Sequence, residues 1–362
     1  MRFLAPLLTI LLLGSAALAG QGPVAAGPVV SVPVAAALED GPYVLWDGPR
    51  ARVLRVRQGQ LETTELGPDR RLVLDGLPAL TLESAPPVPA PAVFPRPQRL
   101  AAVSDVHGNL TGLIKLLTAQ GLLAGDRRWA FGAGHLVVLG DTLDRGPQAT
   151  EALWFLRSLQ AQARAAGGRV HVLLGNHEVM VLRGDLAYLH PKYRALRKVL
   201  GQDQTSLYGP QSEQGRWLRS LPVVVALGDL LFVHGGLSPA LARAGSSLEV
   251  LNAQFRKDLD GSGRSPLLGP EGPIWYRGLL NGQGHRAEAT DLEVTAILAT
   301  FHATTLVVGH TTVDRITAFR QGRVLAVDAG LHLGKPGELL LWDNGTLYRG
   351  LADGNRLPLI PR

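Results

Sequence analysis

Between residues 99 and 174, apolar runs of strand length alternate with helical patterns. The runs lie at residues 99–103, 135–139 and 169–174, and the helical patterns lie between them at about 110–120 and 150–166. Strand, helix and strand in succession are typical of βαβ units, whose strands run parallel. The pattern predicts an α/β fold in which the sheet is covered on both faces.

A polar cluster begins where each of these runs stops, and later apolar runs at residues 230–233 and 304–308 end in the same way. In open α/β sheets, ligands bind at the carboxyl ends of the strands, so we expect the clusters to converge on one crevice. Glycines beside each cluster allow close approach and positive φ angles. The clusters are Ser104–Asn109, Gly140–Gly146, Gly175–Glu178, His234–Gly236 and Gly309–His310.

The clusters offer carboxylate, amide and imidazole groups, and the 362-residue chain has no cysteine. This composition excludes a disulfide scaffold, an iron–sulfur cluster, a Cys-ligated zinc and a cysteine nucleophile. Oxygen and imidazole ligands suit Mn, Fe, Zn or similar ions rather than Cu(I). There are enough groups for two ions, which a shared carboxylate would bridge about 3.5–4 Å apart, as in two-metal hydrolases. The net charge of +6 comes almost entirely from arginine, whose forked side chain favours anionic ligands.

Taken in chain order, the motifs SDVHGN, GDTLDRG, GNHE, FVHGG and VVGH resemble those of the calcineurin-like metallophosphoesterases of phosphoprotein phosphatase type. A later GPIWYR segment, at residues 272–277, is similar to that of the Shewanella-like bacterial branch. The resemblance covers about residues 99–347. It implies an α/β fold class with a metallophosphoesterase β-sandwich flanked by helices in α-β-β-α layers. The implied activity is that of a dinuclear-metal phosphomonoesterase, a protein serine/threonine or tyrosine phosphatase.

Carried over position by position, the resemblance also implies roles for individual residues. His177 would protonate the leaving group, supported by Asp144, because a carboxylate on one ring nitrogen orients the imidazole and favours its protonated form. Arg145 and Arg277 would clamp the phosphoryl oxygens during in-line attack by metal-bound hydroxide. The two divalent ions, with Asp141 as the bridge, would be held by Asp105, His107, Asp141, Asn176, His234 and His310.

The arginine segment departs from the longer Trp-Ser-Asp-Pro signature of the classical branch, so the substrate class stays open. Hydrolysis of dinucleoside polyphosphates or cyclic phosphodiesters is one alternative on the same scaffold, and a non-catalytic metal- or phosphate-binding envelope protein is another. A proton donor at His177 disfavours the pure binder. Glu178 is expected to support the site rather than to catalyse. We expect surface or satisfied core positions for His135, His171, His190, His285, His302 and His332.

The first 19 residues have the features of a signal peptide, namely Arg2, an apolar stretch and the A-x-A text at residues 17–19. We therefore predict cleavage after Ala19 and export to the periplasm or medium. The alternative is an uncleaved tether, although Gly and Pro interrupt the apolar stretch before it reaches the roughly 20 residues of a membrane span. The sequence has no motif typical of nucleic-acid recognition, so we expect no nucleic-acid partner. The expected partner is a phosphomonoester substrate, and we expect no stable membrane insertion after cleavage.

The rest of the chain divides by composition into four segments. Alternating apolar and polar residues with turn signals predict a small antiparallel β unit, and six prolines in thirteen residues indicate a stiff linker. The predicted segments are a flexible leader at 20–37, the β unit at 38–84, the linker at 85–98 and the catalytic domain at 99–350.

Overall fold

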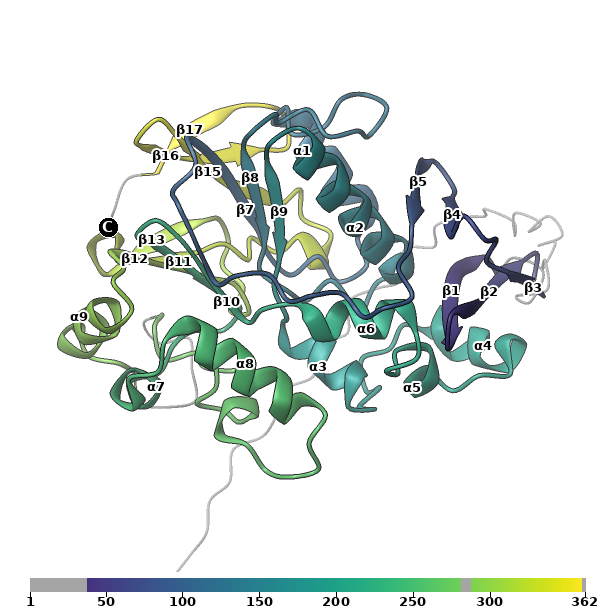
Figure 1. Ribbon diagram of the computed structural model, residues 1–362. Helices are drawn as coiled ribbons and strands as arrows, with labels where there is room; N and C mark the ends of the chain where they lie inside the picture. The colour runs from purple at the N-terminus through teal and green to yellow at the C-terminus, as the bar shows by residue number, and fades with distance from the viewer. Residues whose placement is uncertain (1–37, 281–287, 360–362) are drawn as a thin grey trace, which may run out of the picture.

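Two six-stranded sheets lie face to face in the computed structural model, which describes residues 38–280 and 288–359 (Figure 1). The first sheet has the order β17-β16-β15-β7-β8-β9. The predicted βαβ units form one half of this sheet, with β9 at its edge, because β8 pairs in parallel with both β7 and β9. The strands of this sheet are β7 Arg99–Val103, β8 His135–Val138, β9 Arg169–Val172, β15 Glu338–Asp343, β16 Thr346–Leu351 and β17 Arg356–Pro358.

The second sheet has the order β13-β14-β12-β11-β10-β6. Its centre pairs β11 in parallel with β12, whereas β10 runs antiparallel to β11. The short strand β6 comes from the proline-rich segment and pairs with β10, so part of the predicted linker belongs to this sheet. The division of the chain into domains stays a prediction. The strands are β6 Val93–Phe94, β10 Val224–Leu227, β11 Leu230–Val233, β12 Thr305–Val308, β13 Thr317–Phe319 and β14 Val324–Ala326.

In the first sheet, β7, β8 and β15 are buried on both faces along much of their length, which explains why their residues form apolar runs rather than an alternating pattern. On β7, Leu100 and Ala102 belong to the core between the two sheets, whereas Ala101 and Val103 belong to the core on the helix side. The same inner core contains Phe232 of β11. The α-β-β-α sandwich that the resemblance implied is confirmed.

Helices lie outside the sheets, and α1 and α2 follow β7 and β8 as the sequence pattern predicted. Within the described residues, every helix is too short or too polar to span a bilayer. The helices are α1 Leu110–Ala119, α2 Ala149–Ala165, α3 Asn176–Leu182, α4 Pro191–Leu200, α5 Gln204–Leu207, α6 Glu213–Ser220, α7 Pro239–Ala244, α8 Leu248–Leu259 and α9 Asp291–Thr300.

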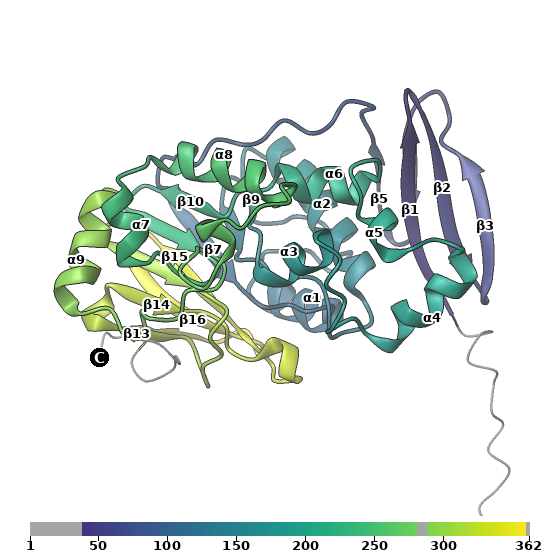
Figure 2. The same ribbon diagram turned by 90° about the horizontal axis from the view of Figure 1, so that it is seen from below.

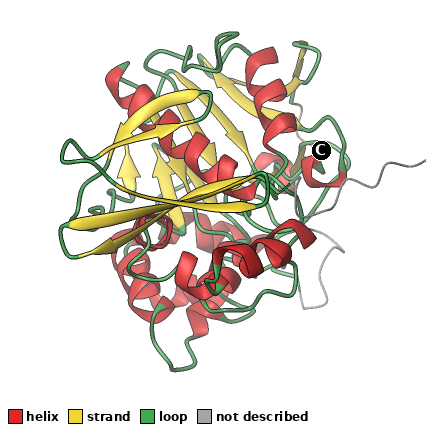
Figure 3. Ribbon diagram, turned by 90° about the vertical axis from the view of Figure 1, so that its right-hand side faces the viewer, coloured by secondary structure: helices red, strands yellow, loops and turns green. Residues whose placement is uncertain are grey.

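The predicted N-terminal β unit is confirmed as a three-stranded antiparallel sheet at one end of the molecule, beside α4 and α6 (Figures 2 and 3). Trp154 of α2 joins its core, and the indole N–H of Trp154 donates to the carbonyl of Pro42 at 2.8 Å. Lys192 of α4 bonds the buried carboxylate of Asp40 at 2.9 Å. The strands are β1 Asp40–Asp47, β2 Arg50–Arg57 and β3 Gln60–Glu65, followed by a separate hairpin of β4 Arg71–Leu74 and β5 Leu77–Thr81.

The core between the sheets should carry much of the stability of the fold. Phe232 is fully buried there, so Phe232→Ala is expected to lower the free energy of unfolding by about 3–5 kcal/mol through lost contacts and a cavity. As a control, Val250→Ala shortens a side chain of α8 that is 56% exposed, and it should change the free energy of unfolding by less than about 0.5 kcal/mol. Urea unfolding measures both, and equal losses would contradict this packing account.

Candidate metal centre

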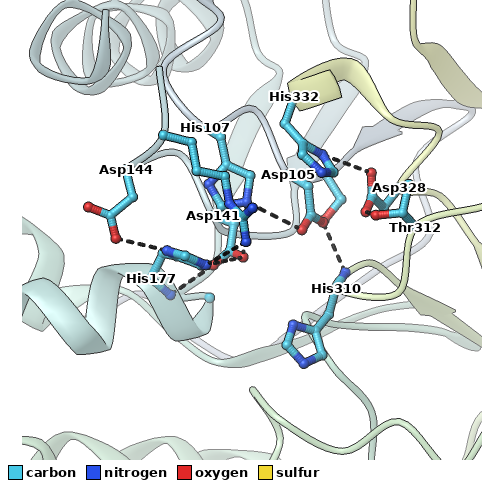
Figure 4. A network of polar contacts seen from close by, with 12 residues as sticks. Asp105, His107, Asp141, Asp144, His177, His310, Thr312, Asp328 and His332 are labelled. Atoms are coloured by element: carbon cyan, nitrogen blue, oxygen red, sulfur yellow. Dashed lines mark hydrogen bonds and ion pairs between the residues drawn. The ribbon is translucent and has the colours of Figure 1, made fainter. Parts of the chain in front are cut away.

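The five strand-end clusters meet at one crevice with a cavity of about 280 Å³. Figure 4 shows Asp105, His107, Asp141, His177 and His310 there. Asp144 and His234 lie behind the lining, where they contact His177 and Asp141. The structure thus brings all ten predicted site residues together; what each of them does stays a proposal. The lining residues are Asp105, His107, Asp141, Arg145, Asn176, His177, Tyr188, Trp275, Arg277, His310, Thr312 and His332.

Asp141, in the loop after β8, is the centre of the cluster. Its Oδ1 accepts the backbone N–H of His177 at 2.9 Å, which ties the loop after β8 to the start of α3. Its Oδ2 lies 3.3 Å from Nε2 of His234 and 3.5 Å from Nε2 of His107. Only glycine fits at position 175, because a Cβ there would overlap Oδ1 of Asp141. One carboxylate therefore faces imidazoles from two different loops.

Asp105, at the end of β7, joins the two sheets. Its Oδ2 accepts the backbone N–H of His310 at 2.9 Å and the hydroxyl of Ser104, and its Oδ1 lies 3.9 Å from Nε2 of His107. A Cβ at Gly309 would collide with Ser104 and Asp105, so glycine allows this approach. The loop after β12 is thereby held against the loop after β7.

Two backbone carbonyls orient the imidazoles. Nδ1 of His107 donates to the carbonyl of Leu143 at 2.8 Å, and Nδ1 of His234 donates to the carbonyl of Leu139 at 2.7 Å. In each ring, Nε2 is then left to face the cluster, which is how proteins commonly present a histidine to a metal. Oδ1 of Asn176 lies 3.0 Å from Nε2 of His234.

Glu178 holds the loop after β8 from behind. Its buried carboxylate accepts the backbone N–H groups of Asp141, Thr142, Leu143 and Gly175 at 2.7–3.0 Å. Burial and the charge of Asp141 raise the pKa of Glu178. Glu178 does not line the crevice, in keeping with the supporting part expected from the sequence.

The loops of the centre have strained backbones. Six of their non-glycine residues have positive φ angles between 44° and 65°, a conformation that costs of order 1–3 kcal/mol for each residue. Hydrogen bonds such as those of Glu178 offset that cost. Strain of this kind clusters where side chains must be aimed at a common point. The six residues are Asp105, His107, Asp141, Asp144, Arg145 and His310.

On one side of the centre, Nδ1 of His177 lies 2.8 Å from Oδ2 of Asp144, and Nη2 of Arg145 lies 3.4 Å from Nε2 of His177. On the other side, Arg277 donates to the carbonyl of His310 at 2.6 Å and to the hydroxyl of Thr311 at 3.0 Å. Burial lowers the pKa of Arg277. The crevice therefore has a histidine–carboxylate pair and two guanidinium groups around its carboxylates.

Several ionisable side chains of this centre are buried away from water. Burial raises the pKa of Asp105 well above its usual value, and the charge of Asp328 raises it further. Burial also acts to raise the pKa of Asp141, but the charge of His234 holds that pKa well below its usual value. Burial lowers the pKa of His234, but the carboxylate of Asp141 outweighs burial and raises it to about 9. Compensating positive charge is thus needed beside these carboxylates.

Comparison with known proteins identifies the family. The family model for calcineurin-like phosphoesterases matches residues 98–314, which is more than half of the chain. The chain belongs to the calcineurin-like phosphoesterase family. The structure of a cold-active protein-tyrosine phosphatase from a psychrophilic Shewanella species is similar over 89% of this chain and 99% of that one, with 37% identity and a TM-score of 0.82.

Curated sequences agree with this assignment. Shewanella-like protein phosphatase 2 of Arabidopsis thaliana is 26% identical over 291 residues, which cover 67% of this chain and 73% of that protein. A symmetrical bis(5'-nucleosyl)-tetraphosphatase of Aromatoleum aromaticum is 31% identical over 140 residues, or 38% of this chain and 44% of the relative. The chain is a metal-dependent phosphatase.

The donor set of this phosphatase fits divalent cations. Asp141 takes part in two groups whose ligand atoms lie within 4.8 Å of one another, one with His107 and His177 and the other with His234 and His310. Nε2 of His310 is buried and has no hydrogen-bond partner, as expected of a nitrogen that serves as a ligand. Carboxylate and imidazole ligands accept Mn, Fe or Zn alike, so the donor set leaves the identity of the ions open.

One expectation from the sequence was wrong. His332 was predicted to be a surface or core residue unrelated to the site, but it lines the crevice with its ring centroid 5.1 Å from that of His107. Nδ1 of His332 lies 3.5 Å from Oδ1 of Asp328, whose Oδ2 accepts the hydroxyl of Thr312 at 2.6 Å. Asp328 follows β14 closely, so the rule that polar groups follow strand ends could have found it.

The remaining unassigned histidines lie outside the crevice or outside the described residues. His135 and His171 contact each other at 3.1 Å on neighbouring strands, and His190 caps α4. His302 lies after the end of α9, and His285 is outside the described residues. Sequence reasoning also missed Tyr188 and Trp275 as lining residues.

Cation binding can be measured without turnover. Excess Mn²⁺ is expected to raise the melting temperature of the purified chain, since a cation at about 100 times its dissociation constant stabilises the folded state by about 2.7 kcal/mol. Asp141→Asn should abolish most of that shift because it removes the shared carboxylate, whereas Asp126→Asn, at an exposed turn, should leave it unchanged. An identical Mn²⁺ shift in the Asp141 variant would contradict the assignment.

Proposed function

We propose that this phosphatase is an exported phosphomonoesterase with two divalent ions, acting on phosphoproteins. The observation that carries the proposal is the His177–Asp144 pair, which faces the shared carboxylate Asp141 in a crevice that also holds two arginines. Phosphoprotein substrates are supported by the similarity to Shewanella-like protein phosphatases and to a tyrosine phosphatase.

Cations bound here would lower the pKa of a water molecule and neutralise charge on the phosphoryl group. The chain's own residues would hold them in place. Asp141 lies near His107, whose Nε2 also faces Asp105. It lies near His234, whose Nε2 also faces Asn176, and it forms a group of candidate ligands with His234 and His310. Asp141 is therefore the residue that would contact both ions.

His177 is suited to protonate the leaving oxygen. Asp144 accepts from Nδ1, which orients the ring and leaves Nε2 toward the crevice. Proton transfer from a positioned group of this kind contributes about 10²–10⁴-fold to a rate. The side chain of Asp144 is fully buried, so water does not compete for this bond.

Arg145 and Arg277 are suited to bind the phosphoryl oxygens. Both line the crevice, and each guanidinium presents several N–H donors in a plane that matches a phosphate. Arg277 is held by the carbonyl of His310, and Arg145 by the ring of Tyr188 at 5.2 Å. Their donors gain strength as negative charge develops on the oxygens they contact.

Hydrolysis of dinucleoside polyphosphates is the second candidate, and the tetraphosphatase match favours it. That match covers 38% of the chain, whereas the matches to Shewanella-like protein phosphatase 2 and to the tyrosine phosphatase cover 67% and 89% of it, so phosphomonoesters are the better supported substrates. Hydrolysis of cyclic phosphodiesters uses the same scaffold and is a third candidate. The His177–Asp144 pair disfavours a non-catalytic metal- or phosphate-binding protein, which would have no use for a proton donor.

Phosphatase activity is expected to require Mn²⁺ or a similar ion and to disappear on chelation. His177→Asn and Asp144→Asn should lower kcat by about 10²–10⁴-fold on a phosphoserine peptide. They should lower it less on p-nitrophenyl phosphate, because nitrophenolate leaves without protonation. Steady-state kinetics on both substrates measure this, with Asp126→Asn as the control.

Two results would overturn this assignment. Activity that survives chelation would exclude the metal-dependent route, and equal losses on both substrates would exclude His177 as the acid. Faster hydrolysis of a dinucleoside tetraphosphate or a cyclic nucleotide than of either monoester would favour the second or the third candidate.

Export rests on the N-terminal residues, which lie outside the described part of the chain. Expression of the full chain in a bacterial host should yield a protein in the periplasm or medium whose first residue is Gly20. Replacement of Ala17 and Ala19 by bulky residues should block cleavage and leave a membrane-associated precursor. Terminal sequencing of fractionated cells checks this, and a cytoplasmic chain that begins at Met1 would exclude export.

A further inference from the structure

Four aromatic rings follow one another along the crevice. The centroids of Tyr188 and His177 are 5.0 Å apart, those of His177 and His107 are 4.5 Å apart, and those of His107 and His332 are 5.1 Å apart, each pair edge to face. Figure 4 shows the three histidines of this row, with His177 beside Asp144. The row therefore ends at Tyr188 on the side of the proposed acid.

Tyr188 differs from the other rings because it is half exposed. It lies in the loop between α3 and α4, and 48% of its surface is accessible. Its carbonyl accepts the backbone N–H of Arg145 at 3.0 Å, and the guanidinium of Arg145 lies 5.2 Å from the ring centroid. The backbone bond sets the position of the loop, and the exposed part of the ring is accessible to a ligand.

The geometry of proton transfer places the leaving group beside this ring. An ester oxygen protonated by His177 must lie about 2.6–3.2 Å from Nε2, and the atoms attached to that oxygen must extend from there toward solvent. Tyr188 is the exposed ring that contacts His177, whereas Trp275 contacts His310, away from the acid. The first atoms of the leaving group therefore pass along Tyr188.

Resting on the proposed function, we propose that Tyr188 is a specificity-determining residue that selects aryl over alkyl phosphate esters. An aromatic leaving group presents a ring to Tyr188 at the 4.5–7 Å centroid separation that favours aromatic pairs. A phosphoserine presents one methylene before its backbone, which offers little surface to the ring. The contact is made with the leaving group rather than with the phosphoryl oxygens, so it changes binding more than the chemical step.

The test compares one peptide made with phosphotyrosine and with phosphoserine, for wild type, Tyr188→Ala, Tyr188→Leu and Tyr188→Phe. Tyr188→Ala is expected to raise KM for the phosphotyrosine peptide about three- to tenfold more than KM for the phosphoserine peptide, because loss of the contact between Tyr188 and Arg145 affects both peptides alike whereas loss of the ring contact affects only the aryl ester. Tyr188→Phe keeps the ring and should match wild type, and Tyr188→Leu should fall between. Melting temperatures with Mn²⁺ confirm that each variant folds and binds the cation.

Each other outcome overturns the proposal in a recognisable way. Equal losses on both peptides would mean that Tyr188 only positions His177 and Arg145. Loss in Tyr188→Phe would assign the effect to the hydroxyl, and unchanged KM in Tyr188→Ala would remove the contact altogether. Wild type inactive on both peptides would overturn the proposed function, and this inference with it.

Discussion

The buried carboxylate of Asp141 is the interaction on which the site depends. It accepts the backbone N–H of His177, and its second oxygen faces His107 and His234 from two other loops. A carboxylate out of water needs positive charge beside it; imidazoles that follow strands of both sheets lie next to Asp141, and a cation in the proposed site would add to that charge. Any change that moves Asp141 therefore moves the proposed acid and the candidate metal ligands together.

The sandwich lets this strained arrangement persist. The loops leave the carboxyl ends of short strands that are buried on both faces, so their starting points are rigid. Six residues of the centre keep left-handed backbones, and hydrogen bonds to Glu178, Leu139 and Leu143 hold the loops in place. The stability of the packed sheets offsets the strain at the site.

The parts of this fold that were predictable from sequence are those with strong local signals. An apolar strand followed by a polar cluster can be recognised in a sequence. This pattern placed Asp105, Asp141 and Asn176 at the carboxyl ends of strands and predicted that they meet. The strand β10 was missed because four apolar residues before a turn carry no distinct period. Likewise, β6 lies among prolines that indicate a linker, and its pairing depends on β10.

His332 and Tyr188 were missed for a different reason. His332 lies in a short 3₁₀ turn and Tyr188 lies in a loop. In such segments no sequence periodicity indicates where a side chain points, and only tertiary contact brings these two residues to the crevice.

The proposal that the centre binds two ions is tested most directly by the anomalous difference map of a crystal grown with Mn²⁺. The account predicts two peaks, one on each side of Asp141. A single peak, or peaks away from Asp141, would contradict it.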